Sequence, residues 1–235
     1  MVAAAIIGLG SFFSYYYGDE ITKVIVDEIN QYITSEISVK EIKFSVFKKF
    51  PDASVEFKEI SIQSADGFTP HGKNDQSFLH AKSIILQFDL ISMLRKEYTI
   101  NNIHINKDNI TIGIDKQGNA NYLFFKTKKQ DKNQKFNLAL KNVKVNNSHF
   151  TYTNNKKRIF FRSLFIKILI KGTFSASDLS LHISGPLFSE HLTIKNKTYL
   201  TSQEIELALP IRVKQKDIYF SSGEINLSGV KAHIK

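Results

Sequence analysis

Short runs of alternating apolar and polar residues recur along the chain from about residue 37 to residue 235. In Ser83–Phe88 every second side chain is Ile, Leu or Phe, and the same period returns in Ile110–Asp115 and Leu179–Ser184. Successive side chains of a strand point to opposite faces, so a period of two indicates strands with one apolar and one polar face. The pattern predicts a mainly β protein.

Turns rich in Asn, Asp, Gly and Lys divide these runs. Asn106–Lys107–Asp108, Asn146–Asn147 and Asn154–Asn155–Lys156 are of hairpin length and tolerate positive φ, so they favour a mostly antiparallel sheet. We predict a loop at Ser64–Ser77 and a short helix at Leu90–Lys96, with Asp89 as its N-cap. The predicted strands are Ile37–Val46, Ala53–Gln63, Leu79–Phe88, Tyr98–Asn106, Asn109–Ile114, Asn121–Phe125, Phe136–Val145, His149–Thr153, Ile159–Lys171, Leu179–Ser184, His191–Lys195, Tyr199–Leu209, Val213–Ser221 and Glu224–Ile234.

The apolar positions of these strands define one face of the sheet, which we call the apolar face. In a sandwich such a face packs against a second sheet about 10 Å away. In a half-pipe or groove it stays uncovered by its own chain and open to an apolar ligand, and the alternation is the same for both. Its predicted members are Ile84, Leu86, Phe88, Ile103, Ile105, Ile110, Ile112, Ile114, Leu138, Leu140, Ile166, Ile168, Leu179, Leu181, Ile183, Ile205, Leu207 and Leu209.

The N-terminus is apolar and uncharged over Val2–Tyr17. This is about one turn short of the usual ~20-residue membrane span, and its tyrosines resemble an interfacial aromatic belt. We interpret residues 1–18 as a membrane anchor; a signal peptide and a buried core helix are the alternatives. The anchor side chains are Ile6, Ile7, Leu9, Phe12, Phe13 and Tyr16.

Residues 19–36 follow as a predicted amphipathic helix. Its apolar residues are spaced by three or four positions, and Asp19 is placed to cap it. The stripe could lie on a membrane surface or cover one end of the sheet, and we favour the second. The stripe consists of Ile21, Val24, Ile25, Ile29, Tyr32 and Ile33.

Composition narrows the class of protein. The apolar fraction of 42% suits a folded core, and the absence of Cys excludes disulfides, thiolate metal sites and thiol catalysis. The net charge of +10 would favour anionic partners, but most of the lysines are scattered singly along the chain. Arg158–Arg162 interleaves basic and aromatic residues, as single-strand nucleic-acid binders do, although a packed or membrane-proximal strand explains it better.

No pattern points to catalysis. His71, His80, His104, His149, His182, His191 and His233 are not spaced as metal ligands, and nucleophile, phosphate-binding and zinc-protease motifs are absent from the sequence. Asp115–Asn121 lacks the acidic residues of a calcium loop, and a turn with Gly118 at positive φ explains it better. We therefore predict a protein that is not an enzyme, with no metal, no cofactor and no nucleic-acid partner.

Several segments in this order resemble the N-terminal region of the AsmA family, in its Bacteroidota form. An apolar anchor and an amphipathic helix ending in Glu28–Asn30 come first. The Phe47–Val55 step into a strand and the strand-to-helix segment Leu79–Leu94 follow. Tyr98–Tyr122 then closes with the Asp-x-x-Gly-x-x-Asn turn of Asp115–Asn121, the most specific piece. The likeness covers roughly residues 1–125, while the basic flank before the anchor and the long C-terminal region of the family have no counterpart.

The resemblance implies a single-pass protein of the bacterial inner membrane with its β domain, residues 37–235, in the periplasm. It also implies kinship with bridge-like lipid-transfer proteins, so we expect a curved half-pipe or groove whose apolar face is left uncovered by its own chain and holds phospholipid acyl chains. Transfer of phospholipid between inner and outer membrane, or support of outer-membrane assembly, is the expected role, with other envelope proteins as further partners. A structural subunit of an envelope complex is the alternative, and a secreted adhesin is a third.

Overall fold

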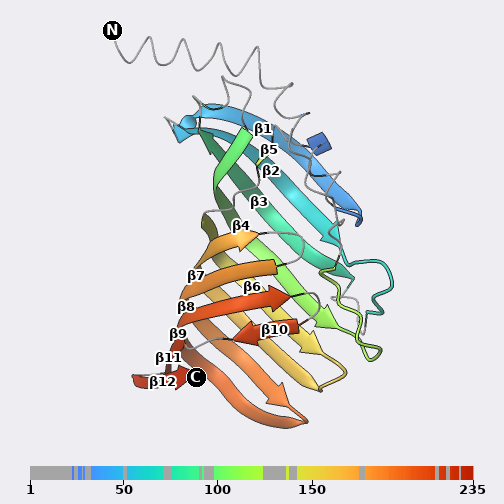
Figure 1. The fold of residues 1–235 in the computed structure, drawn as a ribbon, viewed down its shortest axis with the longest axis vertical. Helices are drawn as coiled ribbons and strands as arrows, with labels where there is room; N and C mark the ends of the chain where they lie inside the picture. The colour runs from blue at the N-terminus through green and yellow to red at the C-terminus, as the bar shows by residue number, and fades with distance from the viewer. Residues whose placement is uncertain are drawn as a thin grey trace.

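The computed structural model describes residues 23, 26–27, 29, 33–49, 52–70, 76–89, 92, 98–123, 136–137, 142–174, 178–214, 217–220, 223–227 and 229–234. In these residues the chain is mainly β, and its strands form one open, mostly antiparallel sheet that curves along its length (Figure 1). The strands are β1 (Ile37–Lys49), β2 (Asp52–Gln63), β3 (Ser77–Asp89), β4 (Tyr98–Ile114), β5 (Phe136–Asn137), β6 (Asn142–Asn154), β7 (Ile159–Phe174), β8 (Asp178–Ile194), β9 (Lys197–Lys214), β10 (Asp217–Phe220), β11 (Gly223–Leu227) and β12 (Val230–Ile234).

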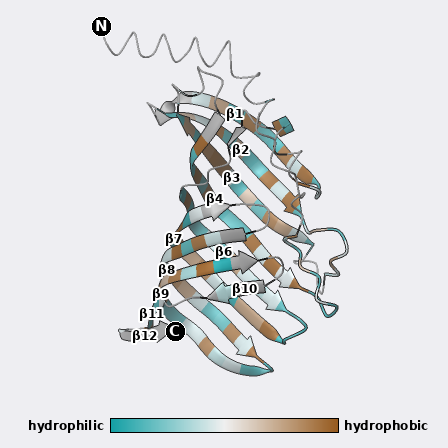
Figure 2. Ribbon diagram, viewed as in Figure 1, coloured by the Kyte–Doolittle hydropathy of each residue, from teal (hydrophilic) through white to brown (hydrophobic). Residues whose placement is uncertain are grey.

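The strand order explains how the sheet is extended. Strands β1 to β4 pair antiparallel with their neighbours, and so do β6 to β9. These two meanders join where β6 pairs parallel with β4, which departs from the predicted antiparallel meander. Beyond β9 the order continues through β11 to β12. The short strand β10 pairs with the C-terminal end of β9, and β5 pairs with the N-terminal end of β4. Figure 2 shows the alternation of hydrophobic and hydrophilic residues along the strands.

Two predicted hairpins are wrong, because the chain continues through them. The segments around Lys107 and Asn147 lie inside β4 and β6, where each residue has φ 51°. One left-handed residue shifts the side-chain alternation but does not reverse the chain. Lys195 (φ 48°) and Asn196 (φ 67°), between β8 and β9, show the reversal by a type I′ turn, which needs two such residues in succession. The predicted turn at residues 154–156 does join two strands, β6 and β7.

Other predicted boundaries also change. The predicted strands Leu179–Ser184 and His191–Lys195 are one strand, β8, and Glu224–Ile234 is the hairpin of β11 and β12. The predicted strand Val213–Ser221 is divided between β9 and β10, and Asn121–Leu123 is a turn.

The cap of the predicted short helix is confirmed. Ser92 is helical, and its backbone N–H donates to the Asp89 carboxylate at 2.6 Å. Such a bond satisfies one of the otherwise unpaired N–H groups at a helix start. The other helix residues lie outside the described part of the chain.

A transverse line of backbone irregularities crosses the sheet, and we call it the crease. The irregular positions have no register partner in the neighbouring strand, although residues on both sides of them are paired. They are Glu59 in β2, Lys82 in β3, Lys107 in β4, Asn147 in β6 and Ile166 in β7. Glu59, Lys107 and Asn147 have φ between 48° and 51°. Side-chain alternation shifts by one at the same place in neighbouring strands. In β3, for example, both Ala81 and Ile84 are buried on the apolar face.

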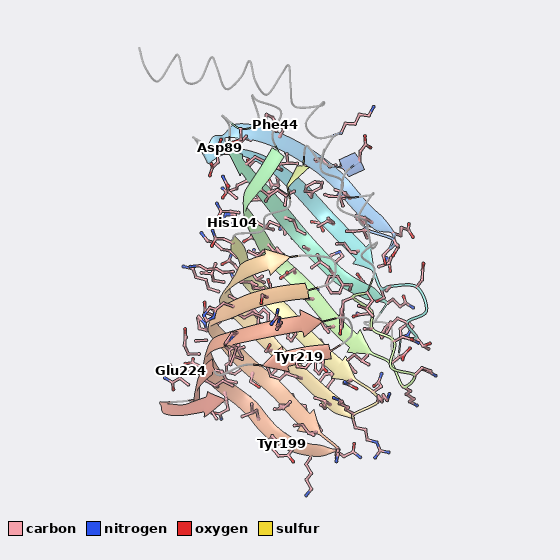
Figure 3. The ribbon with its side chains drawn as sticks, viewed as in Figure 1. Phe44, Asp89, His104, Tyr199, Tyr219 and Glu224 are labelled. Carbon is pink, nitrogen blue, oxygen red and sulfur yellow. The ribbon has the colours of Figure 1, made fainter. Side chains whose placement is uncertain are left out.

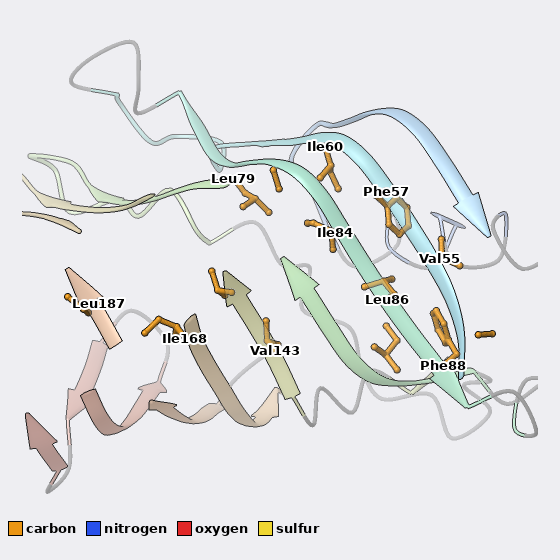
Figure 4. Close-up of a cluster of buried hydrophobic side chains, with 14 of the residues drawn as sticks. Val55, Phe57, Ile60, Leu79, Ile84, Leu86, Phe88, Val143, Ile168 and Leu187 are labelled. Atoms are coloured by element: carbon orange, nitrogen blue, oxygen red, sulfur yellow. The ribbon is translucent and has the colours of Figure 1, made fainter. Parts of the chain in front are cut away.

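The core lies on the concave, apolar face of the sheet. Figure 4 shows buried side chains of β3 and of β6, β7 and β8 directed toward that side. Burial is densest over β2 and β3, where Val55, Phe57, Ile84, Leu86 and Phe88 are at most 8% exposed. From β7 to β11 most apolar-face side chains are only half-buried against the same cluster. The expectation of a face left uncovered by its own chain therefore fails over β2 and β3 and holds only in part elsewhere.

Little of the predicted N-terminal helices can be compared. Residues 1–18 lie outside the described part of the chain, as do most of residues 19–36. Lys23, Val26, Asp27 and Ile29 are helical, and Val26 and Ile29 pack against the core. Ile29 belongs to the predicted apolar stripe, whereas Val26 does not. Among described residues, no helix is long and apolar enough to cross a membrane.

The crease predicts opposite effects for glycine at two exposed lysines in adjacent strands. We expect Lys107→Gly to stabilise the fold by roughly 0.5–1 kcal/mol, because glycine adopts a left-handed backbone without steric cost. Lys82→Gly, at a position without positive φ, should destabilise by roughly the same amount. Urea unfolding of both variants measures the difference. If both substitutions stabilised the fold, or both destabilised it, Lys107 would not be held in a left-handed conformation.

Candidate lipid-binding face

The apolar face forms a continuous row across the sheet. Register pairs Phe44 with Val55, Val55 with Leu86, Leu86 with Ile103, and Ile103 with Val143, and the pairs then continue to Ile170, Ile183 and Leu209. We call these residues the apolar track. Its seven steps between neighbouring strands, at about 4.8 Å each, give a length of roughly 34 Å along the sheet.

A second row runs beside the track on the same face. Ile42, Phe57, Ile84, Ile105, Val145 and Ile168 are paired in turn from β1 to β7. Neighbouring strands thus present apolar side chains to one another in register. Such cross-strand contacts stabilise a sheet by roughly 0.2–1 kcal/mol each.

Most of the predicted apolar-face residues occupy the expected face, and they differ in accessibility. Ile84, Leu86, Phe88, Ile168, Ile205 and Leu209 are buried. Half-buried are Ile103, Ile105, Ile110, Ile112, Ile114, Leu181, Ile183 and Leu207. Leu138 and Leu140 lie outside the described residues, and Leu179 belongs to β8 but its side chain is not described.

Ile166 is wrongly assigned to the apolar face. Its side chain is 42% exposed, while Phe165 and Ile168 on either side pack against the core. Two successive residues, Ile166 and Lys167, therefore point to the polar face. The pairing of β7 with β8 changes register just after Phe165, and this irregularity breaks the strict alternation.

Polar groups interrupt the apolar face, and none of them was among the predicted site residues. Asp108, Ser163 and Ser189 are at most 2% exposed, and their side-chain oxygens have no hydrogen-bond partner among the described residues. Ser163 and Ser189 are paired across β7 and β8, and Asp108 is paired with Ala81. Burial raises the pKa of Asp108 to about 7. The side-chain alternation that puts Ile110 on the apolar face also puts Asp108 there, so the sequence could have revealed this buried acid.

The polar face has a cleft of about 540 Å³ at the crease. Its lining mixes signs, with Lys40, Lys82 and Lys107 beside Glu56 and Glu59. Some of these charges are already paired within the protein. Lys58 contacts Glu41 at 3.1 Å, and the hydroxyl of Ser83 donates to Glu56 at 2.9 Å. A mixed and partly neutralised lining does not select one class of ligand.

The Asp115–Asn121 segment is a tight turn, as predicted. Gly118 has φ 96°, and the N–H of Asp115 donates to the carbonyl of Asn119 at 2.9 Å. Burial works to raise the pKa of Asp115, but hydrogen bonds from Asn119 and Thr69 outweigh it and hold that pKa below its usual value. Across the described part of the chain, no group of His, Asp or Glu side chains is arranged to hold a metal ion.

Family models and curated proteins were compared with the chain. No family model matches the chain, and no curated protein matches it significantly. The AsmA likeness therefore rests on the residues quoted above.

Asp108 predicts a pH-dependent stability. Its folded pKa of about 7 lies above the ordinary 3.8, so the unfolded chain loses its proton first and stability falls as pH rises from about 4 to 7. The loss by pH 8 is roughly 4 kcal/mol, at about 1.36 kcal/mol per pKa unit. Asn at this position cannot ionise, so Asp108→Asn should match the parent at pH 4 and exceed its stability at pH 8. Urea unfolding at both pH values tests this. If the free energies of unfolding of variant and parent differed by the same amount at pH 4 and pH 8, the prediction would be contradicted.

Proposed function

We propose that this chain is a membrane-anchored envelope protein that holds phospholipid acyl chains on its apolar face and passes them between the inner and outer membranes. The AsmA likeness suggests the compartment, with residues 1–18 in the inner membrane and the sheet in the periplasm. The observation that carries the proposal is the apolar track, an unbroken row of Ile, Leu, Val and Phe from β1 to β9.

The dimensions of the track suit an acyl chain. Its length of roughly 34 Å exceeds the hydrocarbon depth of one leaflet, which is roughly 15 Å, half of a bilayer core. Each buried methylene contributes about 0.8 kcal/mol. Where the track is accessible, from β7 onward, each step meets a similar side chain, so a bound tail has no preferred stopping point there and can slide.

Accessibility favours the β7–β11 part of the face as the place of contact. There Ile170, Ile183 and Leu207 are only half-buried, whereas β2 and β3 are already covered. A lipid tail meets this requirement, because it can cover half-buried apolar side chains.

Single cysteines test the proposal directly, since the chain has none of its own. Ile183→Cys places a thiol on the track, and His182→Cys places one on the adjacent exposed position of the polar face. We expect phospholipid to slow maleimide labelling at position 183 by roughly tenfold or more through burial, and to leave position 182 unchanged. Acyl-chain binding would be contradicted if phospholipid left the labelling rate at position 183 unchanged or slowed it equally at both positions. The alternative role, a structural subunit of an envelope complex, would then remain.

A further inference from the structure

Two neighbouring turns at one end of the strands carry exposed cationic side chains. Lys156, Lys157 and Arg158 form the turn between β6 and β7, and Lys195 and Lys197 flank Asn196 in the turn between β8 and β9. The N–H of Lys195 donates to the carbonyl of Arg158 at 2.8 Å, so the turns are held side by side. We call these five cationic residues the basic edge.

No acidic residue balances the basic edge locally. The sequence contains no Asp or Glu in residues 153–162 or 193–203. Among the described residues, none of the five cations has an ion-pair partner. Asp115 and Glu190 have other contacts, because Asp115 accepts hydrogen bonds from Asn119 and Glu190 contacts His149 at 3.3 Å, and neither forms an ion pair with one of the five cations. The edge therefore presents a net positive charge.

Aromatic side chains at this edge indicate the kind of partner. Tyr199 is 59% exposed, and Figure 3 shows it at the lower tip of the sheet. Phe160 is half-buried, with the Arg162 guanidinium 5.6 Å from its ring centre and the His191 ring 6.2 Å away. A single-stranded nucleic acid stacks successive bases on several open ring faces, and of these two rings only that of Tyr199 is exposed. An exposed tyrosine beside lysines suits the headgroup region of a membrane.

We propose that the basic edge docks on an anionic lipid surface, with Lys156, Lys157, Arg158, Lys195 and Lys197 facing the headgroups and Tyr199 at their level. This inference concerns the end of the sheet and not its apolar face, so it stands or falls separately from acyl-chain binding. Each cation near an anionic membrane strengthens association by roughly fivefold at physiological ionic strength.

The absence of Trp from the chain allows a local probe. Tyr199→Trp in the full chain reports only on the basic edge, so attachment of other segments to a vesicle does not alter it. We expect a blue shift of its indole emission with vesicles of phosphatidylcholine containing phosphatidylglycerol, and none with phosphatidylcholine alone. The concentration of vesicles needed should rise steeply with salt, since exposed charges are screened.

A charge variant and matched controls complete the test. Lys156→Gln, Lys157→Gln and Lys195→Gln together should weaken the response of the indole probe at position 199 roughly a hundredfold. Lys40→Gln, Lys82→Gln and Lys107→Gln, which remove the same charge at the crease, should leave it within about twofold. Tyr219→Trp, 52% exposed on β10, should show no shift.

Three results would overturn the inference. The first is equal weakening by both triple variants, which would indicate attraction by net charge alone. The second is an equal shift of the indole probes at positions 199 and 219, or a shift with neutral vesicles. The third is quenching of the probe at position 199 by a single-stranded oligonucleotide at a lower phosphate concentration than by anionic vesicles, which would assign the edge to nucleic acid.

Discussion

One requirement dominates this structure: the apolar face of a single curved sheet must be covered. A sandwich meets this requirement with a second sheet, and the described residues contain one sheet only. Over β2 and β3 the face is buried, and Val26 and Ile29 pack against the core cluster to which it belongs. From β7 to β11 most of its side chains are half-buried, although Ile168, Ile205 and Leu209 are buried. This difference in burial makes the β7–β11 part the better place for an external apolar molecule.

The crease is what keeps the apolar face continuous. In each strand it crosses, side-chain alternation shifts by one, so Ala81 and Ile84 in β3, or Phe165 and Ile168 in β7, share a face. Had only one strand carried the shift, its apolar residues beyond that point would have faced water. A left-handed conformation at Glu59, Lys107 and Asn147 costs roughly 1–2 kcal/mol per residue. The cost is offset because the rows on both sides of the crease stay in register.

Charge is distributed in accordance with this geometry. The polar face and the turns carry the lysines, and pairing such as that of Lys58 with Glu41 neutralises part of the charge at the crease. The basic edge has no such pairing among the described residues. Asp108 is the exception on the apolar face, because burial raises its pKa to about 7 and so favours the protonated form. A lipid-handling sheet with a basic end would contact hydrocarbon on one surface and headgroups at another.

The sequence predicted the class of the fold and most of the apolar face, because a period of two is a local signal that survives folding. It also predicted the Asp89 cap and the Asp115–Asn121 turn, whose hydrogen bonds are local. It could not predict that Lys107 and Asn147 lie within strands, since one positive-φ residue and a tight turn have similar composition. Ile166 was misplaced because the register irregularity after Phe165 breaks the strict alternation on which the prediction relied. The parallel pairing of β4 with β6, and hence the apolar track, depends on contacts distant in sequence that periodicity does not contain.

Native mass spectrometry of the full chain, extracted in detergent, tests acyl-chain binding most directly. We expect phospholipid bound at a defined stoichiometry, retained through mild activation and lost when the apolar track is made polar at Ile183. A chain that carries no phospholipid, or a protein partner in its place, would rule out acyl-chain binding.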